Sequence, residues 1–311
     1  MKTFSRSQGL VFLAGVALLA GCGGGSQLGA NPVQQNLTLR VAQPGRSWIA
    51  PDAKKSDLAY ISNFYSSTIL VFTYPRGKYV GSISDVTDAQ GECTSKTSKG
   101  NWWVVASGAA EVLEYAHGGT TPLKTLSVTA GEPAGCTVDP TTGNLAVTIL
   151  GTGYVVLFTG GSGSGTTLSD TLRSTYSAAY DDKGDLFVDG ITESDMHGVV
   201  ELPKGGSGFE IITLSQSLEF PGGIQWYHKY LAIGDPEAGV IYHFAIHGTK
   251  GKEIGVTSFY AASFWIQGSY VLGTDAGNED GVICRYPAGS PCKTLQGNFD
   301  LPAGVTVSVA N

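Results

Sequence analysis

The sequence has little charge and lacks the short motifs that mark most metal and hydrolase sites. Asp, Glu, Lys and Arg make up 14% of its 311 residues, and it contains only 2 Met and 5 Cys. No CxxC or Cys/His spacing typical of a zinc site is present, and no GxSxG nucleophile motif. The net charge of −7 makes nucleic acid an unexpected partner. No cofactor is predicted.

The N-terminal residues have the pattern of a bacterial lipoprotein signal. Lys2 and Arg6 precede an apolar run, residues 9–20, that is too short to span a bilayer. The run ends Leu-Ala-Gly-Cys, which looks like the lipobox in which the signal is cut before Cys22 and that thiol is lipidated. We therefore predict a signal peptide over residues 1–21 and a membrane anchor on Cys22. Gly23, rather than Asp, follows the Cys and favours outer-membrane sorting.

Two further segments follow the predicted cleavage site. Residues 22–46 are rich in Gly, Gln and Asn and are expected to form a flexible, lipidated tether. Residues 47–311 are rich in Gly, Thr, Tyr and Val, and they suffice for one large all-β domain. The expected location is the cell envelope, at the outer membrane or at a membrane surface that faces the periplasm.

A sequence pattern, called the phrase below, recurs in this domain about every 40–45 residues. It contains a small-residue turn, a short inner strand often ending in Asp, a Gly, a β-rich run and a Gly-containing hairpin. Residues 137–147 are one copy and residues 179–188 are the next. Repeats of this period indicate a solenoid or a propeller.

Aligning the copies predicts the fold class: an all-β, six-bladed β-propeller of four-stranded antiparallel blades. Residues 47–49 look like a degraded first inner strand, and residues 304–307 are an extra copy that is expected to close the ring against the first blade. A seven-bladed ring and a β-solenoid are the alternatives. A seventh blade would lack its second to fourth strands, and a solenoid would have shorter coils.

Four cysteines remain if Cys22 carries lipid. Cys284 and Cys292 flank a hairpin loop, so a cross-strand disulfide between them is a reasonable expectation. Cys93 and Cys136 occupy the same place in successive repeats. Equivalent side chains point the same way around a ring, which argues against a bond between these two, although neighbouring inner strands lie close together.

The hairpins carry a resemblance to known proteins. Residues 74–77 (YPRG), 202–206 (LPKGG) and 286–289 (YPAG) combine Pro, which presets φ, with Gly, which supplies positive φ, and residues 115–119 (YAHGG) carry the Gly alone. With these hairpins, residues 47–311 resemble the NHL-repeat and gluconolactonase-like propeller superfamily, and specifically its bacterial envelope lipoproteins. The resemblance implies the fold and says little about function.

Gluconolactonase-type relatives hold a divalent metal at the channel mouth with Glu and Asn side chains that come just before the inner strands. None of the matching positions here is a carboxylate or Asn, and Glu92 lies one or two places away, alone. We therefore do not expect a metal-dependent lactonase. The matching positions are Gln90, Ala134, Tyr176, Gly222, Ala262 and Ala303.

Other chemically suggestive residues have simpler interpretations. The acidic turns at residues 139–143 and 181–185 lack the spacing of an EF-hand and are predicted to be Asp-capped turns. Residues 275–281 are the strongest cation candidate, although a solvated acidic loop is favoured. His117 lies in a Gly-rich hairpin and is expected to be solvated, and the five His form no triad in the sequence.

The loops of a four-stranded meander emerge alternately on two faces, and sorting them separates the charges. The face that carries the loops after the second and fourth strands collects Asp, Glu and aromatic residues, and the other face collects Lys and Arg. We predict that the acidic face binds a partner, such as a basic protein, a cation or a polysaccharide. The basic face would then lie toward anionic lipid or envelope polymer. The candidate binding residues are Phe64, Tyr65, Glu111, Tyr154, Asp235, Glu237, Asp275, Glu279 and Asp280.

The favoured function is therefore a non-enzymatic, lipid-anchored propeller that acts as a binding or protein-interaction scaffold. The alternative is a lactonase-like hydrolase or lyase with its site at the mouth of the central channel.

Overall fold

The computed structural model describes residues 46–94, 100–275 and 278–310. Cys22, the predicted signal peptide and nearly all of the predicted tether lie outside these residues. Within them no helix is long and apolar enough to cross a membrane. The helical segments described are three short 3₁₀ turns, η1 (Pro51–Lys55), η2 (Ser107–Ala109) and η3 (Thr159–Gly161).

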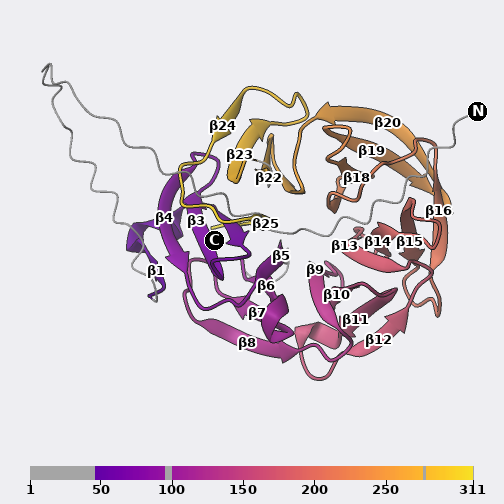
Figure 1. The fold of residues 1–311 in the computed structure, drawn as a ribbon, viewed down its shortest axis with the longest axis horizontal. Helices are drawn as coiled ribbons and strands as arrows, with labels where there is room; N and C mark the ends of the chain where they lie inside the picture. Colours follow the sequence, from indigo (N-terminus) through magenta and orange to yellow (C-terminus); the bar gives the residue numbers. More distant parts are fainter. Residues whose placement is uncertain (1–45, 95–99, 276–277, 311) are drawn as a thin grey trace, which may run out of the picture. The chain divides into compact units, whose positions relative to one another are not determined.

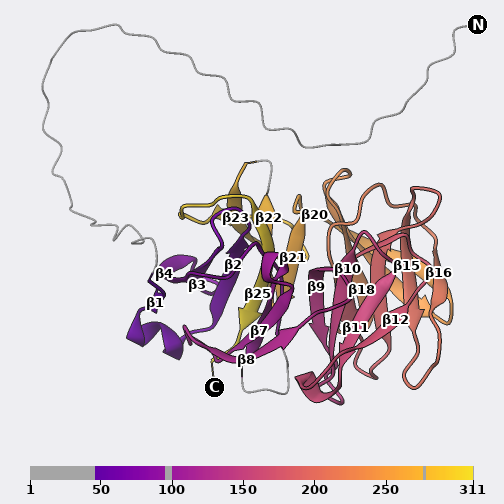
Figure 2. The ribbon, with the colours of Figure 1, turned by 60° about the horizontal axis from the view of Figure 1, so that its bottom comes forward.

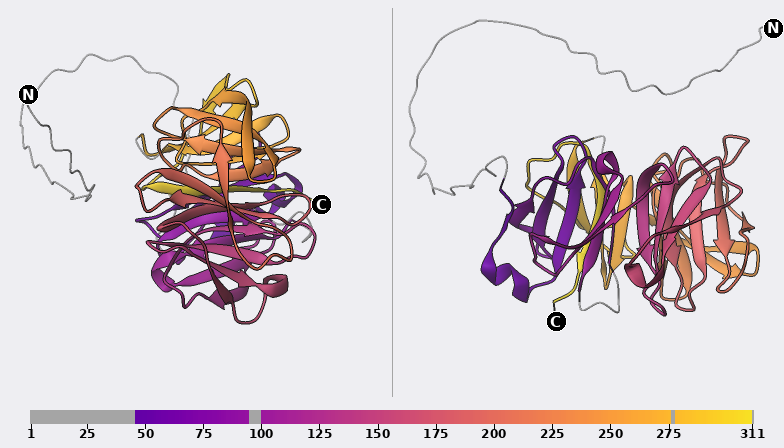
Figure 3. Two further views of the ribbon diagram at one scale, coloured as in Figure 1. Left: turned by 90° about the vertical axis from the view of Figure 1, so that its right-hand side faces the viewer. Right: turned by 90° about the horizontal axis from the view of Figure 1, so that it is seen from below.

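The chain folds into a β-propeller of antiparallel, four-stranded blades arranged about a common axis (Figure 1). The side views show the sheets standing beside one another with their strands running along the axis (Figures 2 and 3). Val, Ile, Tyr and Thr fill the strands, and their alternating side chains suit sheets that are packed on both faces.

Four of the sheets follow the repeat directly. The second is β5 (Ala89–Thr94), β6 (Trp102–Ala106), β7 (Glu111–Tyr115) and β8 (Pro122–Ser127). The third is β9 (Glu132–Val138), β10 (Leu145–Leu150), β11 (Tyr154–Phe158) and β12 (Thr166–Ser169). The last is β21 (Ser263–Gln267), β22 (Tyr270–Asp275), β23 (Asp280–Arg285) and β24 (Cys292–Thr294). The first is β2 (Leu58–Asn63), β3 (Thr68–Thr73) and β4 (Lys78–Ile83), flanked by β25 (Pro302–Ser308) and β1 (Trp48–Ile49).

The remaining sheet has eight strands and consists of two antiparallel meanders. They are β13 (Ser174–Tyr180), β14 (Leu186–Ile191), β15 (His197–Leu202) and β16 (Glu210–Leu214), followed by β17 (Ile224–Tyr227), β18 (Tyr230–Asp235), β19 (Val240–His247) and β20 (Lys250–Ser258). A short parallel pairing joins their outer strands, with Thr213 opposite Lys250 and Leu214 opposite Gly251.

The first sheet contains strands from both ends of the domain. β25 pairs with β2 from Leu58↔Ser308 to Asn63↔Pro302, so the expected contact between the C-terminal strand and the first blade is confirmed. The prediction that residues 47–49 form a first inner strand is wrong. Trp48 and Ile49 pair with Ser82 and Gly81 on the outer edge of β4. Because β25 already occupies the innermost place, these residues extend the sheet on its outer side.

The glycines that open three of the repeats, at positions 91, 135 and 304, have a steric cause. A Cβ on Gly304 would lie 2.1 Å from the carbonyl oxygen of Gln90, and one on Gly91 would lie 2.5 Å from that of Ala134. Both oxygens belong to the innermost strand of the next blade. Neighbouring inner strands therefore touch near the axis, and only a residue without a side chain permits this approach.

Hydroxyl groups link neighbouring inner strands by hydrogen bonds, close to the glycines just described. Thr148 Oγ1 accepts the N–H of Gly135 in its own blade and donates to the Tyr176 carbonyl of the next blade, at 2.8 Å in each case. Ser62 makes the equivalent bridge between the Gly304 N–H and the Gln90 carbonyl. Backbone groups near the axis are satisfied in this way where no ladder partner reaches them.

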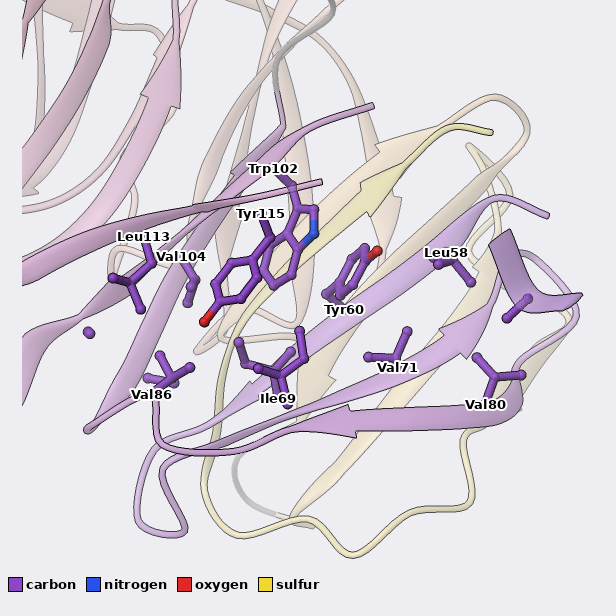
Figure 4. Close-up of a cluster of buried hydrophobic side chains, with 14 residues drawn as sticks. Leu58, Tyr60, Ile69, Val71, Val80, Val86, Trp102, Val104, Leu113 and Tyr115 are labelled. Atoms are coloured by element: carbon purple, nitrogen blue, oxygen red, sulfur yellow. The ribbon is translucent and has the colours of Figure 1, made fainter. Parts of the chain in front are cut away.

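Apolar layers fill the space between blades. Between the first and second sheets, Tyr60 stacks on Trp102 with ring centroids 4.0 Å apart, and Trp102 stacks on Tyr115 at 5.1 Å (Figure 4). Tyr60 and Trp102 are fully buried. Such aromatic pairs contribute about 0.5–1.5 kcal/mol beyond the area they bury.

Two disulfides are present in the described residues. Cys284 pairs with Cys292, directly opposite it on β24. Cys93 is bonded to Cys136, so the argument against that pair is wrong. Cys93 lies opposite Trp103, whereas Cys136 lies opposite Val147. This one-residue offset turns the two side chains in opposite directions, into the same layer between the second and third blades.

Candidate functional site

We call the side that carries the connections after the second and fourth strands of each blade the loop face, and the other side the hairpin face. Acidic side chains that are exposed or half-buried occur in most of the connections of the loop face. Arg173 is the only Lys or Arg in the described parts of these connections, and its guanidinium pairs with Asp195. The acidic residues of these connections are Asp85, Asp88, Asp170, Glu193, Asp195, Glu219, Glu237, Glu279 and Asp300.

The loop face also presents large apolar side chains. Tyr65 is 66% exposed, and its ring lies edge-on to Phe64 with centroids 5.4 Å apart. Tyr154, an expected site residue, is 40% exposed at the start of β11. Sequence reasoning missed Met196, which is also exposed, while Phe220 and Tyr260 lie exposed where the loop sorting placed them. Half of the large apolar residues that are strongly exposed in the described chain therefore share this face with the acids.

Asp235 does not belong to this surface. It is 1% exposed, and its carboxylate accepts the backbone N–H of Glu219 at 2.8 Å and of Ala238 at 3.2 Å. Sorting by loop could not reveal that this side chain turns inward to cap its own turn. Glu92, Asp189 and Phe259, placed on the same face by the sorting, are buried as well. Glu111, at the start of β7, is half-buried.

The acidic segment after β22 forms a capped turn in its described part. The Asp275 carboxylate accepts the backbone N–H of Asn278 at 3.0 Å and its side-chain amide at 2.6 Å. Burial and the neighbouring Asp275 raise the pKa of the Asp280 carboxyl above its ordinary value. Residues 276 and 277 lie outside the described part. Among the described residues, no three His, Cys, Asp or Glu side chains lie close enough to hold a metal ion.

The predicted Asp turns of the hairpin face are confirmed. Asp181 Oδ1 accepts the backbone N–H groups of Lys183, Gly184 and Asp185 at 2.8–2.9 Å. Asp139 caps its turn in the same way, through the N–H and hydroxyl of Thr141. This face is mixed rather than purely basic. Its exposed or half-buried charged residues include Arg76, Lys183, Lys204, Lys229 and Lys293, but also Asp52, Asp57, Asp182 and Asp185.

His117 is not a freely solvated turn residue. Its Nδ1 lies 2.6 Å from Ser308 Oγ, and its Nε2 lies 3.2 Å from the Lys54 carbonyl oxygen. Burial lowers the pKa of His117 below its usual value. Ser308 is completely buried, so this Ser–His contact offers no nucleophile to a substrate. The pair instead ties the C-terminal strand to the second blade.

A cavity of about 630 Å³ runs along the axis, lined by the innermost strands of the blades. Four half-buried aromatic residues that sequence reasoning did not single out line it: Tyr180, Trp226, Tyr227 and Trp265. They lie in the second half of the recurring inner-strand phrase, on β13, β17 and β21. Other copies of the repeat have Thr or Val at the corresponding inner-strand positions. A comparison of the copies at these positions could therefore have identified the aromatic residues.

Glu92, on β5, also lines this cavity. It is 7% exposed, and both of its carboxylate oxygens are buried on the side of β5 that faces the first blade, as is Val104 opposite it. Burial raises the pKa of the Glu92 carboxyl well above its ordinary value, and the backbone N–H of Thr306 offsets that rise only in part. A carboxyl buried with so little compensation favours its neutral form.

Comparisons with known proteins identify the fold. No family model matches the chain, and no curated protein matches it in sequence. A chain in the crystal structure of a nidogen/laminin complex superposes with a TM-score of 0.67 at 11% identity, over 82% of this chain and 99% of that one. The hydrazine synthase of Kuenenia stuttgartiensis superposes with a TM-score of 0.56 at 13% identity, over 81% of this chain and 79% of that one. At such identities the likeness shows a β-propeller and nothing of function.

Proposed function

We propose that this chain is a lipid-anchored binding module of the cell envelope, and that its loop face binds a basic partner protein. Six blades are the natural count, with the eight-stranded sheet taken as two blades because the parallel pairing that joins its halves spans only two residue pairs. The chain would be held at the membrane by lipid on Cys22, with residues 23–46 as the spacer.

The observation that carries the proposal is the coincidence of acidic and apolar side chains on one face that has almost no positive charge. Arg173 is already paired with Asp195, so the exposed acids of the described loop face have little basic compensation in these loops. Exposed aromatic residues supply the contact area that protein interfaces favour. The surrounding carboxylates would steer a positively charged partner toward them.

A protein-interaction role is compatible with the nidogen/laminin neighbour, which is a propeller seen in a protein complex. The loops of a propeller can vary while the blades keep their packing, so a binding face can be built without changing the fold. No arrangement in the described residues favours the alternative of a hydrolase or lyase over binding.

Crosslinking in cells tests this proposal. A photoreactive amino acid at Tyr65 or Tyr260, both on the loop face, should give a discrete crosslinked protein. The same group at Leu123, which is 55% exposed on β8 at the rim, serves as the control. Crosslinks of equal yield and identity from Leu123 would overturn the proposal. Anchoring is tested separately, because Cys22→Ser should abolish fatty-acid labelling and release the chain from the membrane fraction.

A further inference from the structure

We propose that a segment of the basic partner that carries Lys or Arg docks in a groove between the last two blades. This inference rests on the function proposed for the loop face and names the place where the partner's positive charge is held. The groove lies between the end of β20 in one blade and β23 and β24 in the next (Figure 1). Its volume is about 370 Å³, which is enough for a long side chain and part of the backbone beside it.

The outer strand of the last blade leaves room for this groove. β24 has three residues, whereas β20 has nine. The side chains that β24 contributes to the groove are small: Thr294, and Cys292 in its disulfide with Cys284. A Cβ on Gly289 would lie 2.2 Å from the Ser258 carbonyl oxygen, so the hairpin after β23 touches the end of β20. That contact closes one end of the groove.

The basic residues of β23 and β24 lie on the other side of their blade. The Lys293 Nζ donates to the Arg76 carbonyl of the first blade at 2.5 Å. The Arg285 guanidinium lies 4.4 Å from the ring centroid of Tyr270, which packs against the first blade as well. None of the described residues along the groove is Lys, Arg or His. The groove therefore has no positive charge of its own.

Two carboxylates line the groove and face each other across a hairpin. Asp275 on β22 lies directly opposite Asp280 on β23, and like charges in such positions destabilise a sheet. Burial and the neighbouring Asp275 raise the pKa of the Asp280 carboxyl. Asp275 accepts hydrogen bonds from Asn278, whereas none of the described residues donates one to the Asp280 carboxylate. A positive group bound beside Asp280 would relieve the repulsion between the two.

The lining of the groove suits a long basic side chain. Val282 and the disulfide offer apolar surface along which the methylene stem can lie, and Asp280 is available to the charged head. Tyr260, which is 52% exposed, adds an aromatic contact at the rim. A second copy of this chain is a poor occupant, because the net charge of −7 makes two copies repel each other.

Neighbouring residues of β24 provide a matched pair of crosslinking positions. A photoreactive amino acid at Thr294 lies in the groove, and one at Lys293 lies toward the first blade. In cells that express the full chain, position 294 should give the same crosslinked protein as position 65 on the loop face, and position 293 should not. Mass spectrometry should place the crosslink from position 294 in a positively charged segment of that protein.

A single substitution tests the charge of the groove. Asp280→Asn should lower the crosslink yield from position 294 at least about fivefold, and Glu210→Gln, the same charge change on β16, should not alter it. Because Asp280→Asn removes a like-charge pair, the purified variant should melt no lower than the wild type. A markedly lower melting temperature would contradict the repulsion and with it the proposal.

The crosslinks separate failure of the groove from failure of the proposed function. A product from position 65 without one from position 294, or equal yields from positions 293 and 294, would overturn the groove and leave the loop-face function standing. A product from position 294 that consists of two copies of this chain would overturn the groove as well. No product from either Tyr65 or Tyr260 would overturn both proposals.

Discussion

Cys93 and Cys136 join the innermost strands of two adjacent blades, with Cα atoms 5.7 Å apart and a sequence separation of 43. Cys93 lies opposite the second residue of β6, whereas Cys136 lies opposite the third residue of β10. This difference of one residue lets the two side chains point toward each other. The bond is almost completely buried beside the axis. It fastens together two repeats that would otherwise be held by packing and hydrogen bonds alone.

Removing this bond should destabilise the fold more than removing the bond between Cys284 and Cys292. In the loop-entropy description, the longer loop contributes about 4 kcal/mol and the shorter one, of 8 residues, about 2.5 kcal/mol. Urea unfolding of Cys93→Ala/Cys136→Ala and of Cys284→Ala/Cys292→Ala measures both losses. A larger loss in the second pair would show that the inter-blade bond is not the main covalent constraint.

The bridging hydroxyl of Thr148 should contribute measurably to stability. Thr148→Val keeps the shape of the side chain but leaves the Gly135 N–H and the Tyr176 carbonyl without this partner. The expected loss in the free energy of unfolding is about 1–3 kcal/mol. Thr148→Ser keeps the hydroxyl and should lose markedly less. Equal losses would assign the effect to packing rather than to the hydrogen bonds.

Glu92 should make the fold less stable as pH rises. Its pKa in the folded chain lies above the ordinary value of 4.5, so the folded state keeps a proton that the unfolded state has already released. Stability is therefore greatest below about pH 4.5 and falls as the pH increases toward the folded pKa. The free energy of unfolding of Glu92→Gln, relative to wild type, should increase between pH 5 and pH 8. Asp170, whose pKa burial raises to about 6, is common to both proteins and cancels. A difference that does not change with pH would contradict this account.

His243 should make the fold less stable as pH falls, which is the opposite of the effect of Glu92. Burial lowers its pKa, and its Nε2 lies 2.8 Å from the Tyr286 hydroxyl and 3.1 Å from that of Thr257. The unfolded state then binds a proton before the folded state does, so stability contributed by the neutral imidazole is lost as pH falls below about 6.5. His243→Gln should flatten that part of the stability profile between pH 7 and pH 5. An unchanged profile would exclude His243 as its source.

The repeat in the sequence predicted the blades well because each copy carries its own turn chemistry and alternation. The second strands begin where the phrase placed them, at Leu58, Trp102 and Leu145 among others. The two-residue strand β1 was misplaced because Trp48 and Ile49 have the apolar character of an inner strand, and only competition with β25 decides where they pair. Pairing between segments so distant in sequence leaves no local signal.

The candidate site was less predictable, since loop membership does not determine the direction of a side chain. Asp235 and Glu237 share one connection, yet the first caps backbone N–H groups inside the fold and the second is exposed. The offset that brings Cys93 to Cys136 could have been found in the sequence, because Cys93 is the second residue after Gly91 whereas Cys136 is the first after Gly135. The aromatic lining of the cavity required knowing which inner-strand residues turn toward the axis.

The most direct test of the central claim compares two triple variants with the same change in net charge. Asp85→Asn/Glu237→Gln/Glu279→Gln removes three negative charges from the loop face, and Asp52→Asn/Glu210→Gln/Glu253→Gln removes three elsewhere. The yield of the crosslink from Tyr65 should fall at least about fivefold in the first variant and stay at the wild-type level in the second. Equal yields in both variants would contradict the account that the loop face binds its partner through charge.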